Sequence, residues 1–197
     1  MIPRYKNLTI EIDNCKPTTI VEIGTWNGHN AYNMIRTAQN YSSDVIYHGF
    51  DAFGDMDTII SEKEKHVKDI IHDSNSVEDH LKSTGAKIIL HKGYTKDTLP
   101  LFIPETSLDF VFIDGGHSLD TIENDWFWIN KLINVNTVVL FDDCYVDNFD
   151  EGCLLEVSRL KNNPNYIVEF LDPVDVLKPW QIEGVIKIMM VKVKRRF

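Results

Sequence analysis

The chain has 197 residues, of which 43% are hydrophobic and 25% are charged, and its formal net charge is -10. This length suits one domain, and no stretch is apolar enough to cross a bilayer. The acidic balance disfavours nucleic acid as a partner, because phosphate backbones are repelled. The N-terminus lacks the charged-then-apolar order of a secretory signal, so we expect a cytoplasmic protein. We expect a core over residues 17–193, an N-terminal segment over residues 1–16 and a basic tail over residues 194–197.

The cysteines Cys15, Cys144 and Cys153 are odd in number and have no C-x-x-C spacing. This argues against both a disulfide framework and a structural zinc site. We interpret them as reduced thiols.

Apolar, β-branched runs alternate with segments of helical period, which is typical of an α/β fold with a mostly parallel sheet. Strands are expected at residues 18–23, 45–50, 87–91, 108–113, 137–141, 166–171 and 185–193. Helices are expected at residues 29–39, within 57–84, at 119–133, and from an N-cap between Asp147 and Asp150 to about Leu160. The last two strands, joined by residues 172–184, predict a hairpin-like pair that finishes the sheet.

Polar groups follow each of the first five expected strands. They are the turn Glu22-Ile-Gly-Thr-Trp-Asn-Gly28, then Asp51, Gly93-Tyr94, Asp114-Gly-Gly-His117 and Asp142-Asp143. Ligands of open parallel sheets bind beyond the carboxyl ends of the strands. We therefore expect these residues to form one site.

The first turn differs from the dinucleotide fingerprint G-x-G-x-x-G, because Trp26 stands where a glycine lets the backbone approach a pyrophosphate. It favours a ligand with an amino-acid moiety and a ribose, and a dinucleotide fits only if Trp26 turns away from it. Asp51 is placed to accept hydrogen bonds from both ribose hydroxyls, although it can also be a helix cap.

The segments Val21-Glu-Ile-Gly-Thr-Trp-Asn-Gly-His29 and His48-Gly-Phe-Asp51 resemble the class I S-adenosylmethionine-dependent methyltransferases, and the resemblance spans about Thr18 to Val193. It implies one domain with a Rossmann-like, seven-stranded, mostly parallel sheet, an antiparallel last strand and helices on both faces. It also implies the cofactor contacts: Glu22, Gly24, Thr25, Trp26 and Gly28 around the methionine part with Asp114 beside them, Asp51 on the ribose, and Gly93 and Tyr94 against the adenine.

A narrower resemblance is carried by Ile113-Asp-Gly-Gly-His117, Phe141-Asp-Asp143 and Gly152-Cys153. These segments resemble the metal-dependent O-methyltransferases of the macrocin and mycinamicin sugar group, and more distantly those of the catechol type. The resemblance implies that Asp114, Asp142 and Asp143 hold a divalent ion and that the acceptor is a hydroxyl of a sugar or other small diol. A bound ion would hold two substrate oxygens and lower the pKa of the attacking hydroxyl.

The residues themselves point the same way. Carboxylates at neighbouring strand ends repel one another unless a cation neutralises them. Hard oxygen ligands suit Mg2+, with Mn2+ and Ca2+ as alternatives, although paired acids at a strand end can also be caps.

His117, with Asp114, is the expected catalytic pair, because a neutral imidazole can take the proton of the hydroxyl as general base. The alternative is that His117 caps the helix starting near Ser118 or hydrogen-bonds Asp142. Trp180, in the last connection, is a candidate for substrate contact.

Two other functions stay open. One is a metal-independent small-molecule methyltransferase, in which Asp142 and Asp143 only cap and solvate. The other is a non-catalytic, cofactor-binding subunit of a complex. The sequence also leaves a homo-oligomer open.

Overall fold

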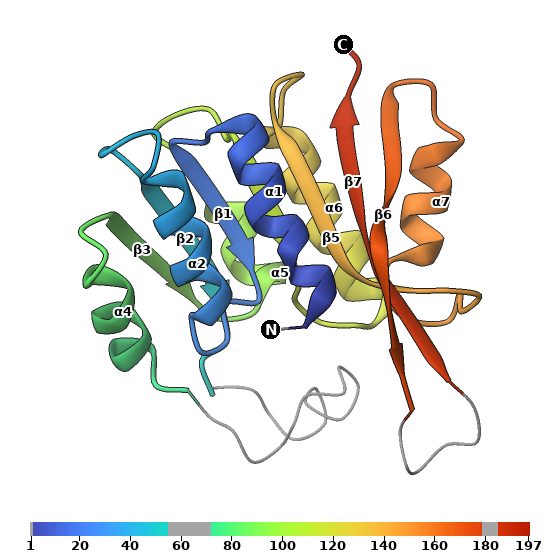
Figure 1. Ribbon diagram of the computed structural model, residues 1–197, viewed down its shortest axis with the longest axis horizontal. Coiled ribbons are helices and arrows are strands. Elements are labelled where there is room, and N and C mark those ends of the chain that lie inside the picture. Colours follow the sequence, from blue (N-terminus) through green and yellow to red (C-terminus); the bar gives the residue numbers. More distant parts are fainter. Residues whose placement is uncertain (1, 55–71, 179–184) are drawn as a thin grey trace.

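The computed structural model describes residues 2–54, 72–178 and 185–197 (Figure 1). Within these ranges seven strands form one sheet in the order β3-β2-β1-β4-β5-β7-β6. Their bounds are β1 Thr19–Ile23, β2 Ile46–Asp51, β3 Lys87–Lys92, β4 Phe110–Ile113, β5 Val138–Tyr145, β6 Tyr166–Leu177 and β7 Ile186–Arg195. Strand β7 pairs antiparallel with β5 and β6, and the other pairs are parallel. The predicted sheet, mostly parallel with an antiparallel last strand, is confirmed.

Helices cover both faces of the sheet (Figure 1). Their bounds are η1 Pro3–Tyr5, α1 Lys6–Cys15, α2 His29–Ala38, α4 Ser74–Lys82, α5 Thr95–Thr98, η2 Leu99–Leu101, α6 Leu119–Leu132 and α7 Leu154–Lys161. Successive side chains of a strand point to opposite faces, so β1 contributes residues to two hydrophobic clusters. Ile20 packs with α1, α2 and α4, whereas Val21 packs with α6 and α7. None of the helices in the described ranges is long and apolar enough to span a membrane.

Strand β5 continues through the two aspartates at which the sequence predicted its end. Phe141 pairs with Val191 and Cys144 with Met189, so Asp142 and Asp143 together face one residue of β7. This is a β-bulge, and Asp143 has the left-handed φ of 52° that such a bulge accommodates. In a regular strand the two side chains would point to opposite faces; the bulge re-aims them and so prepares a shared site.

Three further boundaries differ from the prediction. Helix α7 begins at Leu154 and not near Asp147 or Asp150, because Asp147 has a φ of 68° and the chain turns there. Strand β6 runs on to Leu177, since a second bulge, between Leu171 and Asp175, absorbs the proline that suggested a loop. Strand β7 includes Lys194 and Arg195, which the sequence assigned to a basic tail.

The segment 1–16 was expected to lie outside the core. Instead, Leu8 and Ile12 of α1 are buried in the cluster that α1 shares with α2, and Arg4 of η1 is buried as well. The packed core therefore extends to the N-terminal turn. Of the helical prediction within 57–84, α4 is present; residues 57–71 and Trp180 lie outside the described residues.

A pair of histidines lies between the second and third strands. The rings of His48 on β2 and His91 on β3 stack with centroids 5.4 Å apart, and His91 also stacks on Phe50. Burial, and then the neighbouring His91, lowers the pKa of His48 to about 4, and burial lowers the pKa of His91. The folded protein therefore binds protons here more weakly than the unfolded chain, whose histidines have a pKa of about 6.5.

We expect this pair to weaken the fold as the pH falls from about 6.5 to about 4, by roughly 1–2 kcal/mol, because protons then favour the unfolded chain. Urea unfolding across this range should show a smaller loss of free energy of unfolding for His48→Gln than for the wild type. The control is His29→Gln, which removes an exposed histidine. Identical pH profiles for wild type and His48→Gln would show that the pair has no such effect.

Candidate functional site

The turn after β1 is packed directly on the end of β4. Gly24 has a φ of 89°, and a Cβ built on it would lie 1.9 Å from the backbone oxygen of Asp114. The Gly24 N–H donates to the oxygen of Phe50 at 2.8 Å, so the turn is fixed between β2 and β4. Gly28, with a φ of 76°, begins α2 as its N-cap. At both predicted glycines, a side chain would strain the backbone or displace its neighbours.

Glu22 is buried beneath this turn. Its Oε2 accepts a hydrogen bond from the hydroxyl of Tyr47, which also lies 3.2 Å from Oγ1 of Thr25. Its Oε1 is buried and has no hydrogen-bond partner among the described residues. Burial raises the pKa of Glu22 to about 8, although the hydrogen bond from Tyr47 lowers it in part. The carboxyl is therefore mostly protonated near neutral pH, and one of its buried oxygens has unused hydrogen-bonding capacity among the described residues.

The second and third strands end beside the same turn. The two carboxylate oxygens of Asp51 accept from the backbone N–H groups of Trp26, at 2.8 Å, and Phe53, at 2.7 Å. The Gly93 N–H donates to the backbone oxygen of Asp51 at 2.9 Å, and Tyr94 follows as the N-cap of α5. Asp51 thus caps turn backbone and not a helix. The structure brings the predicted cofactor residues of all three strand ends together.

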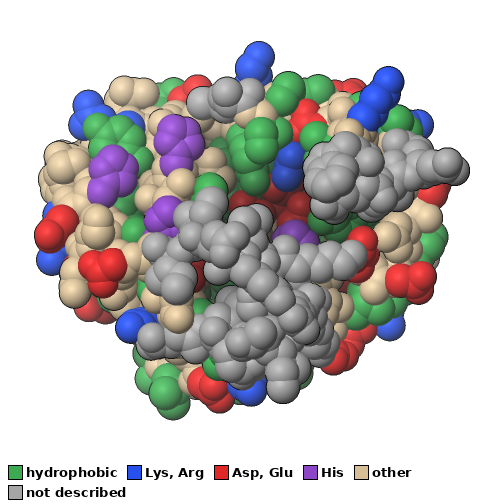
Figure 2. All heavy atoms as spheres, turned by 90° about the horizontal axis from the view of Figure 1, so that it is seen from below, with side chains coloured by type: hydrophobic (Ala, Val, Ile, Leu, Met, Phe, Trp, Pro, Cys, Tyr) green, Lys and Arg blue, Asp and Glu red, His purple; other side chains and the backbone are tan. Residues whose placement is uncertain are grey.

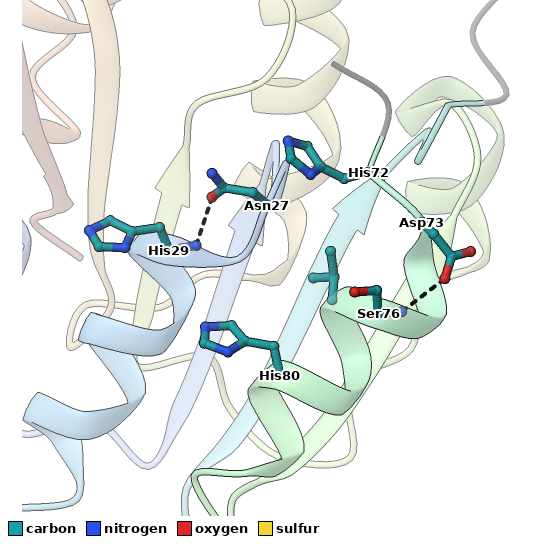
Figure 3. A pocket seen from close by; sticks show the side chains of 7 residues that line it. Asn27, His29, His72, Asp73, Ser76 and His80 are labelled. Atoms are coloured by element: carbon teal, nitrogen blue, oxygen red, sulfur yellow. Dashed lines mark hydrogen bonds between the residues drawn. The ribbon is translucent and has the colours of Figure 1, made fainter.

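Trp26 is the exposed member of this group. Its φ is 47°, and 53% of the residue is accessible to solvent. The indole ring meets the ring of His72 edge-on, with centroids 5.1 Å apart. A cavity of about 410 Å³ opens near it, between the N-terminal ends of α2 and α4 (Figure 3). Its lining residues are Asn27, His29, His72, Asp73, Ser76, Val77 and His80. No sequence pattern indicates that these histidines lie together.

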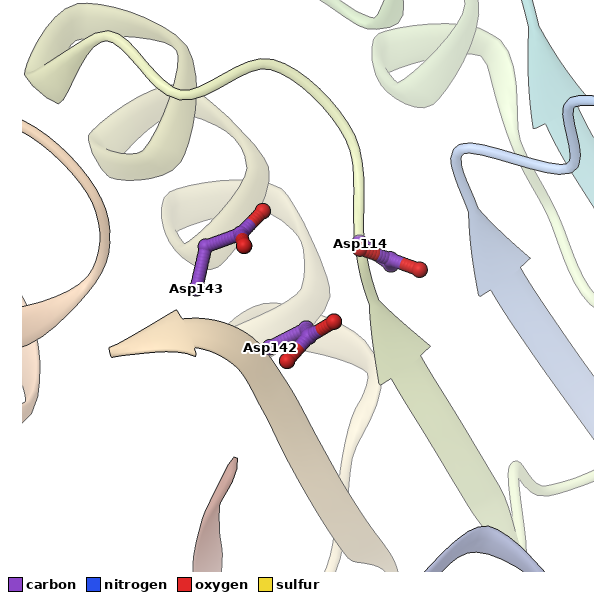
Figure 4. A group of neighbouring side chains, drawn as sticks. All are labelled: Asp114, Asp142 and Asp143. Atoms are coloured by element: carbon purple, nitrogen blue, oxygen red, sulfur yellow. The ribbon is translucent and has the colours of Figure 1, made fainter. Parts of the chain in front are cut away.

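The three acids predicted as metal ligands lie together, Asp114 directly after β4 and Asp142 and Asp143 in the bulge of β5 (Figure 4). One carboxylate oxygen from each of Asp114, Asp142 and Asp143 lies within 4.8 Å of the others. Burial first, and then the charges of Asp142 and Asp143, raises the pKa of Asp114 well above its ordinary value. Burial and the charge of Asp143 raise the pKa of Asp142, against the lowering effect of Arg4. Figure 2 shows acidic side chains at the bottom of a recess on this face.

Arg4 meets this acidic cluster, and nothing in the sequence pointed to it. Its Nε and Nη2 donate to the two carboxylate oxygens of Asp142 at 2.6 and 2.8 Å, and its Nη1 donates to Asp175 at 2.9 Å. Nη2 lies 3.8 Å from Asp143. The next residue, Tyr5, donates its hydroxyl to Asp114 at 3.3 Å. The N-terminal turn thus supplies a cation and a hydrogen-bond donor to the acids.

His117 lies on the other side of Asp143. Its Nε2 is 2.9 Å from Oδ2 of Asp143, and its Nδ1 is 3.4 Å from the hydroxyl of Tyr145. Its carboxylate partner is therefore Asp143 and not Asp142. Ser118, whose side chain accepts from the Thr121 N–H, caps α6, so His117 is not the cap. A cavity of about 270 Å³ opens here, lined by His117, Ser118, Leu119, Asp120, Asp150 and Glu151.

Comparison with known proteins agrees with this arrangement. Residues 21–144 match the model of a family described as a methyltransferase domain. No curated protein matches the chain.

Among solved structures, the fold resembles that of a Streptomyces achromogenes O-methyltransferase involved in tomaymycin synthesis, in complex with S-adenosylmethionine. The TM-score is 0.66, with 18% identity over 97% of this chain and 78% of that one. An O-methyltransferase of Bacillus cereus with bound S-adenosylhomocysteine gives 0.63, with 18% identity over 96% and 80% of the two chains. A putative caffeoyl-CoA O-methyltransferase of Staphylococcus aureus gives 0.58, with 15% identity over 96% and 82%.

The family match covers more than half of the chain and includes the Glu22 to Gly28 turn, Asp51 and all three clustered aspartates. The predicted class of protein is thereby confirmed. The chain belongs to the methyltransferase-domain family and has the class I fold of S-adenosylmethionine-dependent methyltransferases.

Proposed function

We propose that this protein transfers the methyl group of S-adenosylmethionine to a hydroxyl of a small molecule, a sugar or another diol, with the help of a divalent ion. One observation carries the proposal. The Gly24 turn packs directly against the backbone of Asp114, so the predicted cofactor site lies beside the acidic cluster. A methyl donor held by the turn would therefore lie beside an acceptor held at the cluster.

The turn residues suit this cofactor. The buried Oε1 of Glu22, which has no hydrogen-bond partner among the described residues, can accept a hydrogen bond from the amino group of the methionine part. Each carboxylate oxygen of Asp51 accepts one backbone hydrogen bond and keeps lone-pair capacity for a ribose hydroxyl. Gly93 adjoins Asp51, which agrees with a role for Gly93 and Tyr94 near the adenine.

The acidic cluster suits a divalent ion. Carboxylate oxygens are hard ligands, and the spacing of at most 4.8 Å is close to the roughly 4 Å across an Mg2+ ion that binds oxygens at about 2.0–2.1 Å. Arg4 brings one positive charge to Asp142, Asp143 and Asp175, so the group with Asp114 has a surplus of carboxylates. Arg4 uses one lone pair on each oxygen of Asp142, which leaves others for an ion.

The chemistry divides between the bound groups and the chain. S-adenosylmethionine supplies an electrophilic methyl group, and a divalent ion supplies a Lewis acid that makes a hydroxyl easier to deprotonate. His117 accepts the hydroxyl proton as general base. Asp143 orients the imidazole through Nε2, and a cavity of about 270 Å³ opens beside His117.

A second candidate is a metal-independent methyltransferase. The observation that favours it is the pairing of both carboxylate oxygens of Asp142 with Arg4, which gives the cluster a cation of its own. In that case His117 and Asp114 would position the acceptor without an ion.

The first test compares S-adenosylhomocysteine binding and methyl transfer with and without Mg2+, using a panel of small diols as acceptors. In the wild type, EDTA should abolish transfer and Mg2+ should restore it. Asp143→Asn should lower kcat at least about a hundredfold while S-adenosylhomocysteine still binds, because the ion and the orientation of His117 are lost together.

The matched control is Asp147→Asn, a substitution at an exposed residue of the loop that follows β5. It should leave transfer unchanged. Turnover that is insensitive to EDTA would select the metal-independent candidate, and no binding of S-adenosylhomocysteine would refute both.

The second test concerns the proton on Glu22. Because burial raises its pKa to about 8, Glu22 should be mostly protonated at pH 7, and an ammonium group bound beside it should expel that proton. Titration calorimetry with S-adenosylhomocysteine in buffers of different ionisation enthalpy should detect close to one proton released at pH 7. Release should vanish above about pH 9, where Glu22 is already ionised.

Glu22→Gln is nearly isosteric, so it tests the charge. The variant should release no proton and bind S-adenosylhomocysteine at least about tenfold more weakly. Tyr47→Phe keeps the carboxyl and should still release a proton. A binding enthalpy that is the same in every buffer for the wild type would exclude this role of Glu22.

A further inference from the structure

Arg4 links two strands that do not touch each other. Asp142 lies on β5 and Asp175 on β6, and β7 runs between these strands. The guanidinium donates to both carboxylates, and Arg4 as a residue is only 5% exposed. The partners of a buried arginine are therefore important for stability, because removal of one carboxylate leaves a buried positive charge that is less well compensated.

Two bulges make this contact possible. On β5, Asp142 and Asp143 lie between Phe141 and Cys144 and together face one residue of β7, and on β6 the register shifts between Leu171 and Asp175. Both bulges lie opposite the same part of β7, since Tyr145 and Asp175 each pair with Ile188. The two irregularities therefore lie at one level of the sheet, and both provide carboxylates to Arg4.

We propose that Arg4 is the built-in counter-ion of the acidic cluster and that it limits how tightly the cluster holds a divalent ion. The inference rests on the proposed function, which assigns an ion to Asp114, Asp142 and Asp143. Nη2 of Arg4 is 3.8 Å from Asp143, and Arg4 is bound to both oxygens of Asp142. Two of the three ligands thus share their charge with the guanidinium, which repels any second cation beside it.

A counter-ion at this place compensates the charge of the acids when no divalent ion is bound. Without Arg4, the acids would leave an uncompensated negative charge in a buried position whenever no ion is bound. With Arg4, the cluster keeps part of its compensation in the ion-free protein and holds an added ion more loosely. Arg4 is thus a positioning residue for the cluster and does not itself touch the reacting atoms.

The test is the binding of Mn2+, measured by calorimetry and by the electron paramagnetic resonance signal of the free ion. Arg4→Gln should bind Mn2+ at least about tenfold more tightly than the wild type. Its melting temperature should be lower without an ion, and Mn2+ should raise it by more than in the wild type. Arg159→Gln is the control, because it removes an exposed arginine that pairs with Glu123 and Glu156.

A second variant tests the sign of the effect. Asp175→Asn keeps Arg4 on Asp142 but removes its other partner, so more of the positive charge acts on the cluster. Mn2+ should then bind several-fold more weakly than to the wild type, opposite to Arg4→Gln. If Arg4→Gln folds only in the presence of Mn2+, the proposal is supported. If it stays unfolded with and without Mn2+, the proposal is overturned.

The remaining outcomes separate the two proposals. Equal or weaker Mn2+ binding by Arg4→Gln, including no binding by either protein, overturns the role of Arg4. Mn2+ binding by Arg4→Gln but not by the wild type supports that role and overturns metal assistance in the natural protein. S-adenosylhomocysteine binding, measured on the same samples, decides the methyltransferase activity separately.

Discussion

Charge balance at the ends of β4, β5 and β6 is the constraint on which the rest of the site depends. Carboxylates that are out of water repel one another and cannot all ionise without a cation. In this protein one guanidinium, delivered by the N-terminal turn, lies among Asp142, Asp143 and Asp175. Burial, and then the charges of Asp142 and Asp143, raise the pKa of Asp114, while η1 and the two bulges bring Arg4 and the acids together.

The same constraint connects the two halves of the site. The Gly24 turn leans on the backbone of Asp114, and the charge of Glu22 is among the causes that raise the pKa of Asp114. A cationic ligand near the turn and a cation near the acids would therefore influence each other's binding through the same buried carboxyls. The parallel strands that build the core also bring the acids of the site to one edge of the sheet, so the fold determines the electrostatics of the site.

Much of this arrangement follows from local patterns in the sequence. Buried parallel strands read as short apolar runs, and their carboxyl ends must meet, so Asp51, Asp114 and Asp142 could be placed at one edge without a structure. Arg4 could not, because its partner Asp142 is 138 residues away and no periodicity links them. The course of β5 was missed for another reason: two consecutive acids end a hydrophobic run, but pairing with β7 continues past them. The start of α7 was missed because positive φ at Asp147 is not visible in composition.

Because of the bulge in β5, the site depends on the number of residues at this point of the strand as well as on their type. Asp142 and Asp143 share the position opposite one residue of β7, so deleting either residue would give a regular strand with a single acid there. A substitution changes one ligand, whereas such a deletion would also remove the twist that turns the remaining carboxylate towards Asp114. Within related chains, a one-residue gap at this point would mark a protein that keeps the sheet and the cofactor turn but has lost the means to gather acids beside them.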